Sequence, residues 1–237
     1  MKQIRKVLVA NRGEIAVRII STLHKLGIGS VAVYSDQDAH ALHVRSAEQS
    51  VRLDGTGLSA TYLNIQQLIL AARNTGADAI HPGYGFLSES PVFAEAVEKA
   101  GIVFIGPHSE AIRMMGNKVQ SRALVERLGV PVIKGLSGPV QLLLEEAKKM
   151  HFPLLVKAAA GGGGKGMRII YAEAELEEAL EATIREAMNY FGNPEVYLEE
   201  FLVNPRHIEV QLLADQHGKV ITLFERECSV QRRYQKI

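Results

Sequence analysis

The sequence predicts an α/β protein whose first half is built on a parallel sheet. Short apolar runs alternate with stretches whose apolar residues recur at the period of an amphipathic helix. Strands separated by such helices usually pair in parallel and are covered on both faces. The chain has 237 residues, of which 47% are hydrophobic and 22% charged, a composition typical of a globular protein with a buried core.

Strands and helices alternate over residues 1–116. The apolar run at 6–10 predicts the first strand, and Gly27 ends a helix predicted at 14–26. The apolar positions of that helix have helical spacing: Ile15, Ile19, Leu23 and Leu26. The remaining elements predicted here are strands at 31–35, 78–81 and 103–106, and helices at 64–74, 92–99 and 109–115.

A second domain is expected over residues 117–203. Its predicted elements are helices at 118–128, 141–150 and 173–190, and strands at 154–158, 167–171 and 196–202. Asn204-Pro205 marks a further boundary, after which 208–214 and 220–225 are predicted to form an antiparallel hairpin with its turn at 215–218. Residues 204–237 would then begin a third domain, and we expect the chain to be truncated within it.

Composition narrows the class of protein. The 27 basic and 26 acidic residues give a net charge of +1, which does not support a nucleic-acid or membrane-surface role. The single cysteine, Cys228, excludes an intrachain disulfide and fits a reducing compartment. The first apolar run is too short for a signal peptide, and no stretch of about 18 apolar residues could span a bilayer. We therefore expect a cytoplasmic protein.

A run of four glycines between two predicted strands is the most informative segment, and it precedes Lys165. Glycines let backbone N–H groups converge on a phosphate without Cβ clashes, and Lys157 on the entering strand adds a second positive charge. It is not a Walker A loop, because Gly166 stands where Ser or Thr would hold magnesium. The spaced glycines of a dinucleotide fingerprint are also missing after the first strand. The pattern predicts a phosphate loop, with a surface hairpin tip as the alternative.

The order of motifs along the whole chain resembles that of biotin carboxylases. Besides the glycine loop, the motifs are Ala10-Asn11-Arg12-Gly13-Glu14-Ile15-Ala16, His81-Pro82-Gly83-Tyr84-Gly85-Phe86-Leu87-Ser88-Glu89, Phe104-Ile105-Gly106-Pro107, Met115-Gly116-Asn117-Lys118, Asn204-Pro205-Arg206-His207-Ile208-Glu209-Val210-Gln211 and Glu225-Arg226-Glu227-Cys228-Ser229-Val230-Gln231-Arg232-Arg233-Tyr234-Gln235-Lys236. The resemblance implies a Rossmann-like (pre-ATP-grasp) parallel-sheet domain at 1–116, an ATP-grasp small lobe at 117–203 and the start of the ATP-grasp large lobe at 204–237.

The resemblance also implies a reaction. In this family ATP phosphorylates bicarbonate to carboxyphosphate, and the released carbon dioxide is captured by biotin on a carrier protein. The implied cofactors are ATP and Mg²⁺ or Mn²⁺, with biotin as the substrate. The implied partners are a biotin carboxyl carrier protein or domain, a carboxyltransferase and a second copy in a homodimer. Ser21 and Lys25 depart from the Arg and Glu that bacterial homodimers tend to carry at their interface.

Most site residues implied by the resemblance serve the nucleotide. The implied ATP-binding residues are Lys118, Lys157, Gly161, Gly162, Gly163, Gly164, Lys165, Met167, Glu199, Glu200, Phe201, Leu202, His207, Gln231 and Tyr234. Among them, the Glu199 carbonyl and the Leu202 N–H would pair with the adenine edge. Tyr84 and Gly85 are implied on the biotin side. Lys236 is the implied catalytic residue, which stabilises bicarbonate or the charge that develops on carboxyphosphate.

The pattern departs from the family in places and stops early. The glycine run of the family often has five members, and Ala160 stands here in place of the first. Tyr234 occupies a position where His or Asn is common. The metal-binding glutamates of the family, and the arginines that face bicarbonate and biotin, lie beyond residue 237, so no metal ligand is expected and this chain alone is expected to be inactive. The alternatives are another ATP-grasp ligase, such as a carbamoyl-phosphate or purine-pathway enzyme, and a non-catalytic nucleotide-binding fragment.

Overall fold

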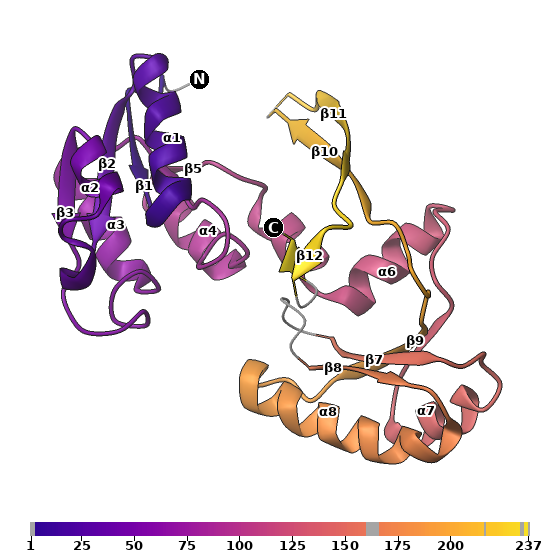
Figure 1. The fold of residues 1–237 in the computed structure, drawn as a ribbon. Coiled ribbons are helices and arrows are strands. Elements are labelled where there is room, and N and C mark those ends of the chain that lie inside the picture. Colours follow the sequence, from indigo (N-terminus) through magenta and orange to yellow (C-terminus); the bar gives the residue numbers. More distant parts are fainter. Residues whose placement is uncertain (1–2, 160–165, 216, 233–234, 237) are drawn as a thin grey trace. The chain divides into compact units, whose positions relative to one another are not determined.

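The protein divides into two compact units, Met1–Gly116 and Asn117–Ile237 (Figure 1). The computed structural model describes residues 3–159, 166–215, 217–232 and 235–236. The side chains of Lys118, Gln235 and Lys236 are not among the described atoms. The division into three domains at 116/117 and 203/204 stays a prediction.

The first unit is built on a five-stranded sheet with the order β3-β2-β1-β4-β5. Its strands are β1 (Lys6–Val9), β2 (Gly29–Tyr34), β3 (Gln49–Arg52), β4 (Ala79–His81) and β5 (Val103–Phe104). All neighbouring pairs are parallel, which confirms the predicted parallel sheet. The strand order reverses at β1, so the carboxyl ends of β1 and β4 are neighbours, a place where open α/β sheets commonly bind ligands.

Helices cover both faces of this sheet. Alternate residues of β1 point to opposite sides. Val7 and Val9 pack with buried residues of α1 (Gly13–Lys25), whereas Leu8 packs with those of α3 (Ile65–Thr75) and α4 (Pro91–Lys99). The unit also contains α2 (Leu42–Ser46), α5 (Ser109–Gly116) and the short turn η1 (Asp36–Asp38).

Local capping explains where two of these helices begin. Asn64 accepts a hydrogen bond from the Gln67 N–H at the start of α3, and Ser90 accepts one from the Phe93 N–H at the start of α4. Such side chains satisfy N–H groups that have no partner within the helix. The helix predicted at 64–74 therefore agrees with α3 to within a residue at each end.

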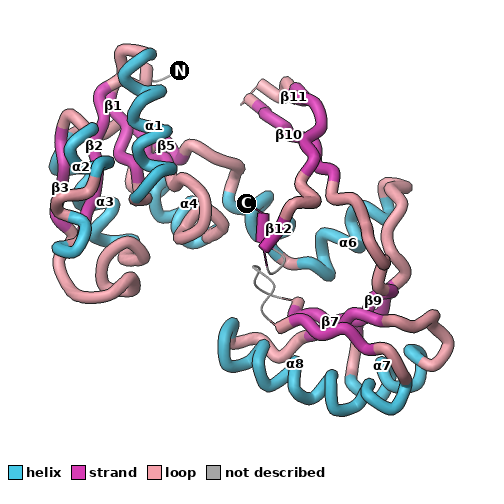
Figure 2. Tube along the Cα trace, viewed as in Figure 1, coloured by secondary structure: helices cyan, strands magenta, loops and turns pink. Residues whose placement is uncertain are grey.

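The second unit contains an antiparallel sheet with the order β6-β9-β7-β8. Its strands are β6 (Gly135–Ser137), β7 (Leu154–Ala158), β8 (Met167–Ile170) and β9 (Val196–Glu200). Leu154, Val156 and Leu198 point to an apolar face that packs against α7 (Val140–Ala147) and α8 (Leu176–Phe191), which lie on the same side of the sheet in Figure 2. The helix predicted from residue 173 starts as the short turn η2 (Glu173–Glu175).

Two further strand pairs follow in this unit. Strands β10 (Ile208–Ala214) and β11 (Val220–Glu227) form the predicted antiparallel hairpin, with an irregular register between Val210 and Leu212. The short strands β12 (Gln231–Arg232) and β13 (Gln235–Lys236) also pair in antiparallel fashion. The unit opens with α6 (Lys118–Arg127), whose first turn is capped by Asn117. Within the described ranges, no helix has both the length and the hydropathy needed to cross a bilayer.

Some elements were not predicted from the sequence. Strand β3 lies at the edge of its sheet, and three of its four residues are exposed, so it has no apolar run to reveal it. Helix α2 and strands β6, β12 and β13 are too short for a periodic signal.

Candidate functional site

The polar face of the second sheet carries a lysine–glutamate pair. Lys157 on β7 lies directly opposite Tyr197 on β9, and Glu199 follows two residues later on the same face. The Lys157 ammonium donates a hydrogen bond to the Glu199 carboxylate and lies 5.9 Å from the centre of the Tyr197 ring. Only 21% of the Lys157 side chain and 8% of the Glu199 side chain are exposed. Since neither charge is fully hydrated, each depends on the other for compensation.

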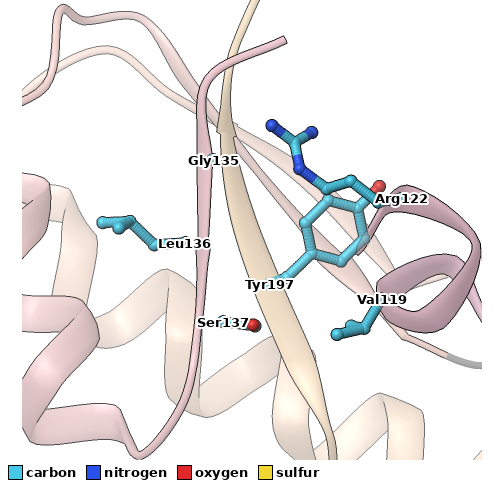
Figure 3. A pocket seen from close by; sticks show the side chains of 6 residues that line it. All are labelled: Val119, Arg122, Gly135, Leu136, Ser137 and Tyr197. Carbon is cyan, nitrogen blue, oxygen red and sulfur yellow. The ribbon is translucent and has the colours of Figure 1, made fainter. Parts of the chain in front are cut away.

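Tyr197 remains a neutral phenol beside this pair. Burial, followed by the Glu199 carboxylate, raises the pKa of its hydroxyl above the ordinary value. Arg122 of α6 acts in the opposite direction, and Figure 3 shows its side chain beside the Tyr197 ring. The polar face therefore holds two opposite charges and a protonated hydroxyl.

A small cavity lies where α6 packs against this face. Its volume is about 30 Å³, and it is lined by Val119, Arg122, Gly135, Leu136, Ser137 and Tyr197 (Figure 3). This space suits a water molecule or two, whereas ligand pockets usually have volumes of roughly 300 Å³ or more. The cavity is a packing feature and not the nucleotide site.

The ends of the glycine loop are held together by strand pairing. Lys157 and Met167 face each other across β7 and β8, and the Ala158 N–H donates to the Gly166 carbonyl at 2.9 Å. Met167 therefore shares the polar face with Lys157. Gly161, Gly162, Gly163, Gly164 and Lys165 lie outside the described residues, so their predicted phosphate contacts stay predictions. Lys118 is the first residue of α6, and its side chain is likewise outside the described atoms.

The register of β9 bears on the predicted adenine contact. The Glu200 N–H donates to the Lys134 carbonyl on one side, and the Phe201 N–H donates to the Pro153 carbonyl on the other. Because such bonds alternate between the two neighbouring strands, the N–H and C=O of Glu199 are directed at Leu155 on β7. The predicted pairing of the Glu199 carbonyl with a base stays a prediction, and this ladder argues against it.

The segment after β9 offers free backbone. Phe201 and Leu202 lie beyond the last residue of the strand, and the Leu202 side chain is 51% exposed. The N–H of Leu202 has no hydrogen-bond partner among the described residues. The predicted contact of this N–H with a base is therefore compatible with the strand pairing.

The second unit brings His207 and Gln231 together. The Gln231 amide donates to Nδ1 of the His207 ring at 2.7 Å and to the Cys228 carbonyl at 3.0 Å. The amide NH₂ can only donate, so Nδ1 of the ring is the acceptor in this contact. Lys236 pairs with Gln231 across β12 and β13, which places its backbone at this cluster. The Lys236 side chain and Tyr234 lie outside what the structure describes.

Tyr84 and Gly85 belong to the first unit, in the turn after β4. The Tyr84 side chain is 61% exposed, and its hydroxyl donates to the Glu14 carboxylate. That hydrogen bond raises the pKa of the Tyr84 hydroxyl. Gly85 has a positive φ of 62°, which a residue with a side chain rarely adopts.

The described residues contain no group of three or more His, Cys, Asp or Glu side chains that could hold a metal ion. Of the residues implied to bind the nucleotide, the structure describes the side chains of Lys157, Met167, Glu199, Glu200, Phe201, Leu202, His207 and Gln231, and their nucleotide contacts stay predictions. The contact of the Glu199 carboxylate with Lys157 is not predicted from the sequence, which implies a role only for the Glu199 backbone carbonyl.

Comparison with known proteins shows two matching families. Residues 3–112 match the biotin carboxylase N-terminal domain, and residues 117–237 match the ATP-binding domain of the carbamoyl-phosphate synthase L chain. Pyruvate carboxylase of Staphylococcus aureus is 50% identical over the whole chain, which spans 21% of that protein. Biotin carboxylase of Pseudomonas aeruginosa is 48% identical over 99% of the chain, which spans 53% of it. The chain thus spans about half the length of the biotin carboxylases that it matches.

Solved structures give the same result. The biotin carboxylase domain dimer of Hydrogenobacter thermophilus 2-oxoglutarate carboxylase, in complex with MgADP, ADP and bicarbonate, has a TM-score of 0.94 and 45% identity, and the match covers the whole of this chain and 52% of that one. A biotin carboxylase–β,γ-ATP complex from Campylobacter jejuni has a TM-score of 0.95 and 44% identity, with coverages of 99% and 53%.

Proposed function

The chain belongs to the biotin carboxylase family, and from this membership we propose that it supplies the ATP-binding part of an enzyme that carboxylates biotin with ATP and bicarbonate. The observation that carries the proposal is the Lys157–Glu199 pair on the polar face of the sheet, next to the connection that contains the glycines. A cation in that place suits the phosphates of a nucleotide.

Each residue group has a proposed role in the first step. Lys157, with Lys118 and the glycine loop, neutralises and orients the phosphates, because phosphoryl transfer depends on positioning and charge stabilisation. Leu202 presents its backbone N–H to the base, with Phe201 beside it, and His207 and Gln231 reach the ribose or phosphates. Lys236 stabilises bicarbonate or the developing carboxyphosphate. Tyr84 and Gly85 are proposed to face biotin.

Magnesium or manganese would reduce the repulsion between the transferring oxygens when bound. The described residues hold no cluster that fits such an ion, so we assign it no ligand and no step in this chain. The proposed partners are a biotin carboxyl carrier protein or domain, a carboxyltransferase and a second copy, and the proposed location is the cytoplasm. The dimeric state of the Hydrogenobacter domain supports the second copy, and the single cysteine of this chain fits the proposed location. The carrier and the carboxyltransferase are proposed from family membership alone.

A different ATP-dependent ligase is the second candidate, since the family of residues 117–237 is named after carbamoyl-phosphate synthase. The match of residues 3–112 to the biotin carboxylase N-terminal domain favours the first candidate. The third, a non-catalytic nucleotide-binding fragment, applies to residues 1–237 taken alone, because they span about half of the related biotin carboxylases.

The test is ATP hydrolysis that depends on both bicarbonate and free biotin, measured on residues 1–237 and on the longest protein that the gene encodes. We expect activity only in a protein that also contains the region corresponding to the rest of the relatives. Lys157→Met should lower kcat/KM for ATP by about 100-fold, whereas Lys149→Met, at a 69% exposed side chain, should leave it unchanged. ATP binding without any response to bicarbonate or biotin would favour the other ligases.

A further inference from the structure

Asn11, two residues after the end of β1, makes contacts that the proposed function leaves unexplained. Its side-chain amide donates to the Pro82 carbonyl at 2.8 Å and to the Tyr84 carbonyl at 2.8 Å, while its oxygen accepts the Arg12 N–H at 2.9 Å. The residue is only 4% exposed. Two carbonyl groups can be satisfied only by the NH₂ side of the amide, so these contacts also fix its orientation.

The loop at 82–86 closes around this amide as tightly as the backbone permits. A Cβ on Gly83 would lie 2.6 Å from the Asn11 side-chain nitrogen, and Gly83 has a φ of 69°. The Gly83 N–H donates to Nδ1 of His81 at 3.0 Å. The loop also contains Phe86, a residue with a side chain and a φ of 47°. A turn that merely reversed the chain would not need a positive φ at Phe86. Such a backbone conformation persists only where surrounding contacts hold it.

Two neighbours of Asn11 hold the rim of the same loop. Glu14 accepts the Tyr84 hydroxyl, and the Arg12 guanidinium lies 5.7 Å from the centre of the Phe86 ring. Arg12 is itself held by Asp38, at 3.0 Å. The turn after β1 thus fixes the turn after β4, at the edge where the strand order reverses.

We propose that Asn11 is a positioning residue, which fixes the loop at 82–86 so that the exposed Tyr84 and Gly85 meet biotin as a preformed surface. This inference rests on the proposed function, because that function makes biotin the ligand of the loop. An exposed loop that is already ordered loses little conformational freedom when a ligand binds, so affinity depends on the groups that hold it. Asn11 contacts the buried side of the loop, and because it is only 4% exposed we do not expect it to touch the ligand.

The first test is steady-state kinetics in the longest protein that the gene encodes. Asn11→Ala should raise KM for biotin by about tenfold and leave KM for ATP within about twofold, since a loosened loop affects only the ligand that it faces. Asn11→Asp keeps the shape but turns a carboxylate oxygen toward two carbonyl oxygens, so it should behave no better than Asn11→Ala. Asn64→Ala, the same substitution at the cap of α3, is the matched control and should leave both KM values unchanged.

The second test is amide hydrogen exchange of residues 83–88 in residues 1–237 without any ligand. Both Asn11 variants should exchange these amides at least tenfold faster than the parent protein, with β2 unaffected. Unchanged exchange in the loop would overturn the positioning role, as would a normal KM for biotin in Asn11→Asp. If the loop exchanges as expected but the longest protein that the gene encodes shows no biotin-dependent turnover, the proposed function and the choice of biotin as ligand would be refuted instead.

Discussion

Removing either member of the Lys157–Glu199 pair should destabilise the second unit, and the two losses should not add. Breaking a buried ion pair by removing one partner costs about 3–5 kcal/mol when both groups are fully buried. Lys157→Met leaves the Glu199 carboxylate, which is 8% exposed, without its cation, so we expect a loss of about 3 kcal/mol. Glu199→Gln leaves Lys157, which is 21% exposed and better hydrated, so we expect about 2 kcal/mol.

The double variant contains no unpaired charge. It should therefore cost about 2 kcal/mol less than the sum of the single variants. Because the chain has two units, a single unfolding curve would mix their transitions. Amide exchange of residues 154–158 and 196–200, followed at increasing urea concentration, reports the free energy of opening of this sheet alone.

The matched control is the pair Lys149–Glu146, with side chains 69% and 35% exposed. Lys149→Met and Glu146→Gln should each change stability by less than about 1 kcal/mol, as surface pairs usually do. Additivity within about 0.5 kcal/mol at Lys157 and Glu199 would refute the reasoning. So would a greater loss from Glu199→Gln than from Lys157→Met, because the order follows from the burial of the charge left behind.

Three further predictions concern the first unit. Gly83→Ala should destabilise the first unit by about 2 kcal/mol in urea unfolding, because the new Cβ is strained at positive φ and meets Asn11. The loss should be smaller when Asn11→Ala is also present, and equal losses with and without Asn11→Ala would contradict that contact. Burial lowers the pKa of His43 and His81 below the ordinary 6.5, so their stabilising contribution is complete above about pH 6.5 and is lost as the pH falls through the lower folded values. The free energies of opening of β2 and of residues 83–88, obtained from amide exchange after correction for the pH dependence of the intrinsic exchange rate, should fall between pH 7 and 5, and constant values would contradict this. Burial would raise the pKa of Asp38, but hydrogen bonds from neighbouring side chains outweigh it and hold the pKa below its ordinary value. Stability from this carboxylate is therefore lost as the pH falls below about 4. Asp38→Asn should make the stability depend less on pH in that range, as measured by acid titration followed by circular dichroism.

The sequence predicts those parts of the fold that depend on local periodicity. The strand predicted at 154–158 is identical to β7, because its apolar run is buried within the sheet. Strand β3 escapes prediction because it pairs at an edge and buries almost nothing. Its presence depends on β2 offering a free edge, a property of the assembled sheet and not of residues 49–52.

The candidate site divides in the same way. Lys157 is recognisable from the sequence because it precedes a run of glycines. The carboxylate that binds it lies 42 positions further along the chain and is brought there by the register of β7 and β9. Asn11 is similar, since its two acceptors lie 71 and 73 positions away. Contacts between residues so far apart in the sequence follow from strand pairing, so they cannot be read from local patterns in a single sequence.

The Lys157–Glu199 pair also explains how the Lys157 ammonium can be accommodated in a partly buried site before a ligand binds. A lysine removed from water without a partner tends to lose its proton or to destabilise the fold. Glu199 keeps the charge of Lys157 in place before a nucleotide arrives, with the ring of Tyr197 beside it. An incoming phosphate can then replace the carboxylate as the partner of Lys157, or share Lys157 with it. Nucleotide binding would thus exchange one anion for another beside a lysine that is already charged. The same contact thus stabilises the free protein and prepares it for its proposed ligand, which is why its removal should affect stability and nucleotide binding together.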